Sequence, residues 1–180
     1  MPSKGVSMSP KQVAETLPDV KMRFKDAFPY PGVVVMMGQR GSGKTATAMW
    51  VMEELHKTLG IGGVIYQAPN ALKKMMPDWV EFSTNIKRLP HECVVIIDEA
   101  QQEANSRRSS SEANLDLANA VALSRQRKQL IFLISHHSRK LDMVDVMDAS
   151  RIIWKQPSAG QVMFERKEIK PFSERAIAKY

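Results

Sequence analysis

Only one cysteine, Cys93, occurs in the 180 residues, so an internal disulfide is impossible and a reducing compartment is expected. Cys93 begins an apolar run, which favours a buried structural thiol over a reactive one. Long apolar runs are also lacking: none approaches the roughly 18 residues that span a membrane. Residues 1–7 have no apolar core of the kind found in a secretory signal. We therefore expect a cytoplasmic protein, neither secreted nor transmembrane.

Acidic residues are fewer than basic ones, 19 against 26, which gives a formal net charge of +7. This excess favours a polyanionic partner, although mildly basic proteins without one are common. The length suits one domain with a sizeable core, burying roughly 70% of the surface of the unfolded chain. We divide the chain into residues 1–30, an N-terminal helix and a basic–aromatic lead-in, and residues 31–180, a catalytic domain.

Residues 33–45 join an apolar run to a glycine-rich loop: Val-Val-Val-Met-Met is followed by Gly-Gln-Arg-Gly-Ser-Gly-Lys-Thr. The run predicts a buried parallel strand, and residues 46–59 predict the helix that leaves the loop. Strand, Gly-x-x-x-x-Gly-Lys-Thr and helix together form a nucleoside triphosphate site, in which backbone N–H groups face the phosphates. The predicted nucleotide contacts are Gly38, Gln39, Arg40, Gly41, Ser42, Gly43, Lys44, Thr45 and Ala46.

Two pairs of residues carry the expected chemistry of this site. Lys44 is predicted to reach the β- and γ-phosphates, and the Thr45 hydroxyl to bind Mg²⁺. A second apolar run, residues 94–97, ends in Asp98 and Glu99. Asp98 is predicted to hold the Mg²⁺ through water, and Glu99 to orient and polarise the attacking water.

A third apolar run, residues 130–134, ends in Ser-His-His. A strand that follows the other two in this way is predicted to deliver a polar sensor beside the γ-phosphate. His136 or His137 can serve, because a histidine titrates near neutral pH. The alternative is that both are histidines at the edge of the core.

Both ends of the chain carry smaller elements. Ser9 and Gln12 predict a capping box at the start of a short helix. Residues 21–30 alternate basic with apolar and aromatic residues, which favours a half-buried edge segment over a nucleic-acid contact. Residues 151–155 and 161–165 predict two strands joined by a turn. The expected fold is α/β: a three-layer P-loop NTPase with a mostly parallel sheet of about five core strands and a C-terminal β-hairpin.

The order of these motifs resembles the FtsK–HerA superfamily of DNA-pumping ATPases. It is most similar to the small genome-packaging ATPases of membrane-containing viruses, and also to the ATPase domain of zonula-occludens-toxin-type phage assembly proteins. The resemblance covers residues 32 to about 155 and is most specific in residues 124–142, Ser-Arg-Gln-Arg-Lys through Ser-His-His-Ser-Arg-Lys-Leu-Asp. His136 stands where the family usually has glutamine.

The resemblance implies ATP and Mg²⁺ as cofactors and a ring, pentameric or hexameric, in which an arginine of one subunit completes the site of its neighbour. We expect a helix from residue 112 to about 128, on which Arg125 and Arg127 point about 200° apart, so at most one can be this arginine. Arg125 is favoured because it follows apolar residues and is expected on the packed side. Arg127 is expected to face solvent or DNA.

Double-stranded DNA is the expected substrate, with viral capsid or membrane-vertex proteins as further partners. Its contacts are predicted at Arg107, Arg108, Arg127 and Lys128, although a solvated helix face also explains this basic stretch. The predicted function is a Mg²⁺-dependent ATPase, a ring-forming motor that packages DNA. The alternatives are an assembly or secretion ATPase acting on protein, and a slow nucleotide-switched adaptor.

Overall fold

A computed structural model describes residues 9, 11, 12, 15, 23–98, 110–141 and 143–179. Its centre is a six-stranded sheet of order β3-β2-β4-β5-β1-β6, in which every hydrogen-bonded pair is parallel. The predicted α/β P-loop architecture is confirmed. The strands are β1 (Gly32–Met37), β2 (Gly62–Tyr66), β3 (Val80–Ser83), β4 (Cys93–Asp98), β5 (Gln129–Ser135) and β6 (Arg151–Trp154).

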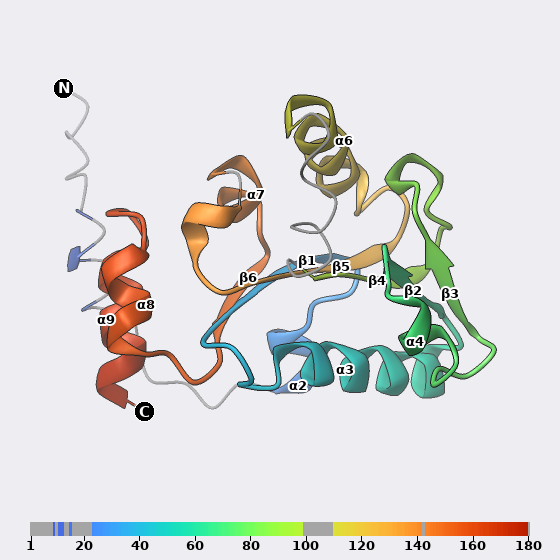
Figure 1. Cartoon of the computed structure of the whole chain (residues 1–180), viewed down its shortest axis with the longest axis horizontal. Coiled ribbons are helices and arrows are strands. Elements are labelled where there is room, and N and C mark those ends of the chain that lie inside the picture. The colour runs from blue at the N-terminus through green and yellow to red at the C-terminus, as the bar shows by residue number, and fades with distance from the viewer. Residues whose placement is uncertain are drawn as a thin grey trace, which may run out of the picture.

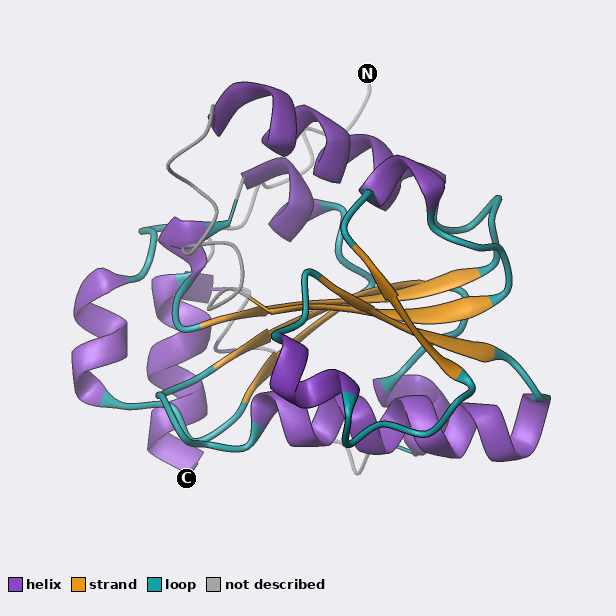
Figure 2. Ribbon diagram, turned by 45° about the vertical axis from the view of Figure 1, so that its right-hand side comes forward, coloured by secondary structure: helices purple, strands orange, loops and turns teal. Residues whose placement is uncertain are grey.

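Helices cover both faces of the sheet (Figures 1 and 2). One face carries α2 (Phe24–Ala27), α3 (Lys44–Leu59) and α4 (Asn70–Lys73), and the other carries α6 (Ser110–Leu123) and α7 (Met143–Met147). The last two helices, α8 (Ala159–Phe164) and α9 (Lys170–Lys179), lie together at one end of the sheet. Among the described segments, no helix has both the length and the apolar character to cross a membrane.

The core consists of two apolar layers, one on each face of the sheet. In β1, Val33, Val35 and Met37 pack on the α6 side, whereas Val34 and Met36 pack on the α3 side. All six residues of β1 and all seven of β5 are buried. A parallel strand between two helical layers has no solvent face, which is why these strands are continuous apolar runs in the sequence.

The sheet has one strand more than expected. β3 escapes sequence reasoning because it is short and lies at the sheet edge, with Glu81 exposed. In α3, Ala48, Met52 and Leu55 are buried, whereas Leu59 is 56% exposed. Leu59 lies in the last turn, directly before the C-cap Gly60.

The predicted C-terminal β-hairpin is wrong. Its first strand is β6, but residues 159–164 form helix α8. Ser158 caps this helix, since its Oγ accepts a hydrogen bond from the Gln161 N–H at 3.2 Å. Gln161 and Val162 are buried, Met163 and Phe164 are exposed, and Glu165 is buried again, which is the spacing of one face of a helix.

The helix expected over residues 112–128 ends at Leu123. The chain then turns, with Lys128 in the left-handed conformation at φ 51°. This turn is required because Gln129, which follows directly, is fully buried at the start of β5. Arg125 and Arg127 therefore lie in a turn, and the helical angle between them does not apply.

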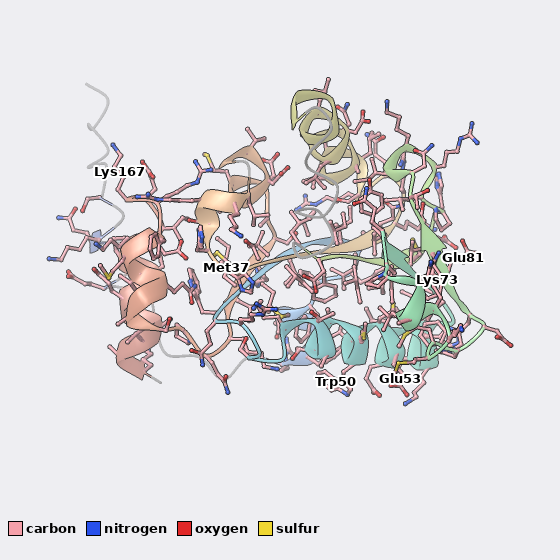
Figure 3. The ribbon with its side chains drawn as sticks, in the orientation of Figure 1. Met37, Trp50, Glu53, Lys73, Glu81 and Lys167 are labelled. Atoms are coloured by element: carbon pink, nitrogen blue, oxygen red, sulfur yellow. The ribbon has the colours of Figure 1, made fainter. Side chains whose placement is uncertain are left out.

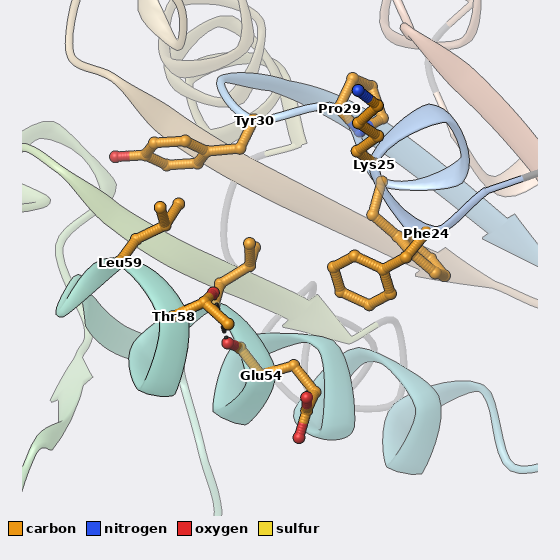
Figure 4. Close-up of a pocket in the computed structure, with 9 residues that line it drawn as sticks. Phe24, Lys25, Pro29, Tyr30, Glu54, Thr58 and Leu59 are labelled. Atoms are coloured by element: carbon orange, nitrogen blue, oxygen red, sulfur yellow. Dashed lines mark hydrogen bonds between the residues drawn. The ribbon is translucent and has the colours of Figure 1, made fainter.

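The described residues of the N-terminal region lie in two places: Lys11 and Glu15 lie beside α9, whereas residues 23–30 pack on the α3 face. The predicted capping box is confirmed: Ser9 N–H donates to Gln12 Oε1 at 2.9 Å, and Gln12 N–H donates to Ser9 Oγ at 3.4 Å. Phe24, Phe28 and Tyr30 are half-buried against the core, which confirms the half-buried edge segment over these residues. They line a cleft of about 460 Å³ together with Leu59 and its neighbours on α3 (Figure 4).

Candidate nucleotide-binding site

Three adjacent strands deliver the candidate residues to one edge of the sheet. β4, β5 and β1 are neighbours and run parallel, so their carboxyl ends share an edge. In register, Met37 of β1 pairs with Ser135 of β5, and Asp98 of β4 pairs with Ile134 of β5. Met37 marks this edge in Figure 3. The phosphate loop, Asp98 and the turn that begins with His136 consequently lie side by side.

The loop can adopt its shape only because of its glycines. Gly38 has a φ of +152°, and a Cβ at this position would lie 1.8 Å from the carbonyl oxygen of Lys155. Gly43, the N-cap of α3, has a φ of +80°, in the left-handed region. The backbone therefore turns tightly into α3, and a side chain at position 38 would push β1 away from the chain after β6.

Lys44 is 6% exposed and bends back over the loop. Its Nζ donates to the carbonyl oxygens of Gly38 and Gln39, both at 2.9 Å. A buried ammonium needs compensating groups, and phosphate oxygens are stronger partners than carbonyls. Ser42, also in the loop, has a buried Oγ without a hydrogen-bond partner among the described residues. These buried donors fit a bound phosphate chain.

Thr45 and Asp98 meet across the edge: Thr45 Oγ1 donates to Asp98 Oδ2 at 2.5 Å. A hydroxyl and a carboxylate oxygen are hard ligands that suit Mg²⁺, which otherwise keeps waters and phosphate oxygens. Within the described residues, no three His, Cys, Asp or Glu side chains group as a metal site. The pair therefore fits an ion that takes its further ligands from water and phosphate oxygens.

His136, rather than His137, faces the loop. Its Nδ1 lies 3.5 Å from Lys44 Nζ, and its side chain is half-buried. His137 contacts the ring of Phe164, with 6.0 Å between the ring centroids. Glu99, Arg107 and Arg108 lie outside the described residues.

The basic residues before β5 lie at the amino ends of the strands, whereas the phosphate loop lies at their carboxyl ends; these residues are Arg125, Arg127 and Lys128. The seven residues of β5 span the distance between the two ends, about 20 Å at ~3.3 Å per residue. Arg125 is exposed, contrary to its expected place on a packed face, and Arg127 is half-buried beside Ile86 and Asp116. Lys128 forms an exposed ion pair with Glu92 at 2.6 Å.

Lys155 is a site residue that the sequence reasoning missed. Its backbone N–H donates to Met37 O at 2.7 Å, and its Nζ donates to Gly43 O at 3.2 Å and to Thr47 Oγ1. Lys155 therefore joins the start of α3 to the chain that follows β6. The sequence shows only that Lys155 lies at the end of a predicted strand. Its contact with the phosphate loop could be predicted only if that strand, β6, were known to pair with β1.

Comparisons with known proteins agree with this fold. Residues 34–157 match the family model "ATPase family associated with various cellular activities (AAA)". No curated protein matches the chain. Among solved structures, the genome packaging NTPase B204 from Sulfolobus turreted icosahedral virus 2, in complex with AMP, is similar at 16% identity and a TM-score of 0.53, over 82% of this chain and 85% of that one.

A second solved structure, C. elegans PCH-2, is similar at 15% identity and a TM-score of 0.43. The match covers 83% of this chain and 40% of PCH-2. At 16% identity the likeness to B204 shows the fold alone. The family model spans more than half of the chain and contains the phosphate loop, Asp98 and His136. The chain therefore belongs to the AAA family of ATPases.

Proposed function

We propose that the chain is a Mg²⁺-dependent ATPase that assembles as a ring and moves double-stranded DNA, as in the packaging of a viral genome. One observation carries the catalytic part: Lys44, the Thr45–Asp98 pair and His136 converge at the carboxyl edge of β1, β4 and β5. A phosphate cradle, a hard-ion site and a polar side chain at the γ-phosphate position are the parts that phosphoryl transfer to water requires.

Each residue has a distinct task in this proposal. Lys44 exchanges its bonds to Gly38 O and Gln39 O for β- and γ-phosphate oxygens. Thr45 and Asp98 hold Mg²⁺, which when bound neutralises charge that develops on the phosphates. His136 contacts the γ-phosphate or the attacking water. Glu99, directly after β4, positions that water.

The position of Arg125 supports a ring. It is exposed and lies at the amino ends of the strands, about 20 Å from the phosphate loop of the same subunit at their carboxyl ends. An arginine at this distance can complete a site only in a neighbouring subunit. A homo-oligomeric ring, pentameric or hexameric, supplies such a neighbour at every site.

DNA as the substrate is supported by the net charge of +7 and by the fold shared with the viral packaging NTPase B204. An assembly ATPase acting on protein is the second candidate. It is favoured because two residues predicted to contact DNA are less available for phosphates: Lys128 forms an ion pair with Glu92, and Arg127 is half-buried.

The test is ATP hydrolysis by protein of measured oligomeric state, with and without double-stranded DNA, beside Lys44→Ala. Wild-type turnover that DNA stimulates and Lys44→Ala abolishes would support the motor. Turnover that is indifferent to DNA would favour the assembly ATPase. Tight ATP binding with turnover near zero would instead indicate a nucleotide switch. Native turnover in Lys44→Ala would refute the site.

A further inference from the structure

A buried polar cluster lies just beyond the nucleotide site, where the turn after β5 meets the C-terminal helices. Its members are Ser138, 0% exposed, Glu165, 2% exposed, and Gln161, 7% exposed. They come from segments more than 20 residues apart in sequence. None of them has a task in the hydrolysis proposed above.

Glu165 is the centre of the cluster. Its Oε2 accepts hydrogen bonds from the Ser138 N–H at 3.2 Å and from Ser138 Oγ at 2.5 Å. Its Oε1 accepts from Gln161 Nε2 at 3.2 Å. Both carboxylate oxygens are thus engaged, and one of them holds both the backbone and the side chain of Ser138.

Arg166 holds the same turn from its other side. Its Nε donates to Ser138 O at 3.2 Å, its backbone N–H donates to Ser138 Oγ at 3.3 Å, and its Nη2 donates to Leu141 O at 2.6 Å. Ser138 therefore has its N–H, carbonyl and hydroxyl all bonded to two consecutive residues. Such a site accepts one geometry, because moving any member leaves a buried polar group unpaired.

The cluster fixes the segment that carries the sensor. Ser138 follows His136 by two residues, and Ser135 Oγ donates to His137 O at 3.0 Å, which closes the turn between them. β5 anchors this turn at one end and Glu165 anchors it at the other. The position of His136 against Lys44 consequently depends on both anchors.

The same C-terminal segment also reaches the phosphate loop. Lys155, directly after β6, donates to Gly43 O and Thr47 Oγ1, and α8 follows a few residues later. Residues 155–166 thus contact the site at two points, the first turn of α3 and the sensor turn. α8 and α9 lie together at this end of the sheet (Figure 1).

We propose that Glu165 is a positioning residue that holds His136 through Ser138 and couples the occupancy of the γ-phosphate site to helices α8 and α9. This inference rests on the proposed ATPase function. A shift of His136 toward a bound γ-phosphate pulls on Ser138 and, through Glu165, on the end of α8. In the opposite direction, a partner that moves α8 and α9 changes turnover without touching the nucleotide.

The test combines kinetics with amide hydrogen exchange, read with and without a non-hydrolysable ATP analogue and Mg²⁺. In the wild type, the analogue should slow exchange in residues 38–47, 135–141 and 159–170. In Ser138→Ala, the first segment should still respond and the last should not. Turnover should fall about tenfold or more, with KM within about threefold, as for loss of an interaction made mainly in the transition state.

Two further variants separate positioning from mere stability. Glu165→Gln keeps an oxygen for Ser138, and the Gln161 amide can turn to accept from the new amide, so this variant should restore most of the turnover that Glu165→Ala loses. Asn85→Ala is the control, because it removes the side-chain cap of the short helix Ile86–Arg88, which has no part in this inference. It should lower the Tm and leave turnover near the wild-type value.

Two results would overturn the inference alone: wild-type turnover in both Ser138→Ala and Glu165→Ala, or protection of residues 38–47 by the analogue with no response in residues 159–170. Absence of protection at residues 38–47 in the wild type would instead refute the nucleotide site, and the inference with it.

Discussion

The ammonium nitrogen of Lys44 lies 3.5 Å from Nδ1 of His136, across the edge between the loop after β1 and the turn after β5. A γ-phosphate held by Lys44 would therefore lie within reach of the imidazole. The FtsK–HerA superfamily, which the sequence resembles, usually has glutamine at this position. Histidine and glutamine both offer a nitrogen donor and an acceptor at the end of a short side chain.

His136→Ala should reduce turnover by about 10², the usual cost of one lost donor at a developing charge, with ATP affinity nearly unchanged. His136→Gln should recover part of the loss, since the amide N–H₂ can reach the same oxygen. Steady-state turnover and binding of a non-hydrolysable analogue measure the two effects. A silent His136→Ala beside a damaging His137→Ala would move the sensor one residue along.

Gly38→Ala should destabilise the protein far more than Gly41→Ala. The new Cβ at position 38 would overlap the carbonyl of Lys155, which is backbone and cannot rotate away, whereas a Cβ at position 41 meets nothing within 4 Å. Gly41→Ala should cost about 1 kcal/mol, from its φ of +77° alone. Urea unfolding of both variants measures the difference. Equal losses would show that the chain after β6 yields easily.

Arg125→Ala should bind ATP normally and hydrolyse it poorly, by a factor of about 10³ if the arginine completes a neighbouring site. Mixed rings of Arg125→Ala and Lys44→Ala subunits should regain activity, because an intact phosphate loop can then use the arginine of a neighbour. The measurement is turnover of the mixture, with mixing confirmed by mass. Mixed rings as inactive as their parents would exclude Arg125 from this role.

Cys93 should resist alkylation in the native protein. It is 1% exposed, and burial raises the pKa of its thiol to about 12, so almost no thiolate forms at pH 8. Because the unfolded thiol ionises at lower pH, stability should fall as the pH rises from about 9 toward 12. Iodoacetamide labelling followed by mass spectrometry should be slow natively and fast in urea. Fast native labelling would show that the α6 side of the sheet opens readily.

The fold was predictable to the extent that burial leaves a pattern in the sequence. β1, β4 and β5 are buried on both faces, so each is an unbroken apolar run, and polar residues mark the edge where each one ends. That pattern identifies Lys44, Thr45, Asp98 and His136 together. Local patterns of this kind need no knowledge of which strands are neighbours.

The features that were missed depend on tertiary contacts. Residues 162–164 are a short apolar run of the kind found in strands, but residues 159–164 form a helix, and Glu165, which follows it, is held by the distant Ser138. The end of α6 follows from the burial of Gln129. Lys155 becomes visible only when β6 is known to pair with β1.

The pairing of β1 also sets the order in which the chain can fold. β1 emerges early in synthesis, yet its two neighbours, β5 and β6, begin only at Gln129 and Arg151. β2, β3 and β4 can pair with one another sooner, whereas the strand that carries the phosphate loop must wait for the last third of the chain. Non-local parallel pairing of this kind is slow and leaves an apolar segment open to aggregation. Competence to bind nucleotide should therefore appear only after translation of β6, and a nascent chain arrested before Gln129 should depend on chaperones for its solubility.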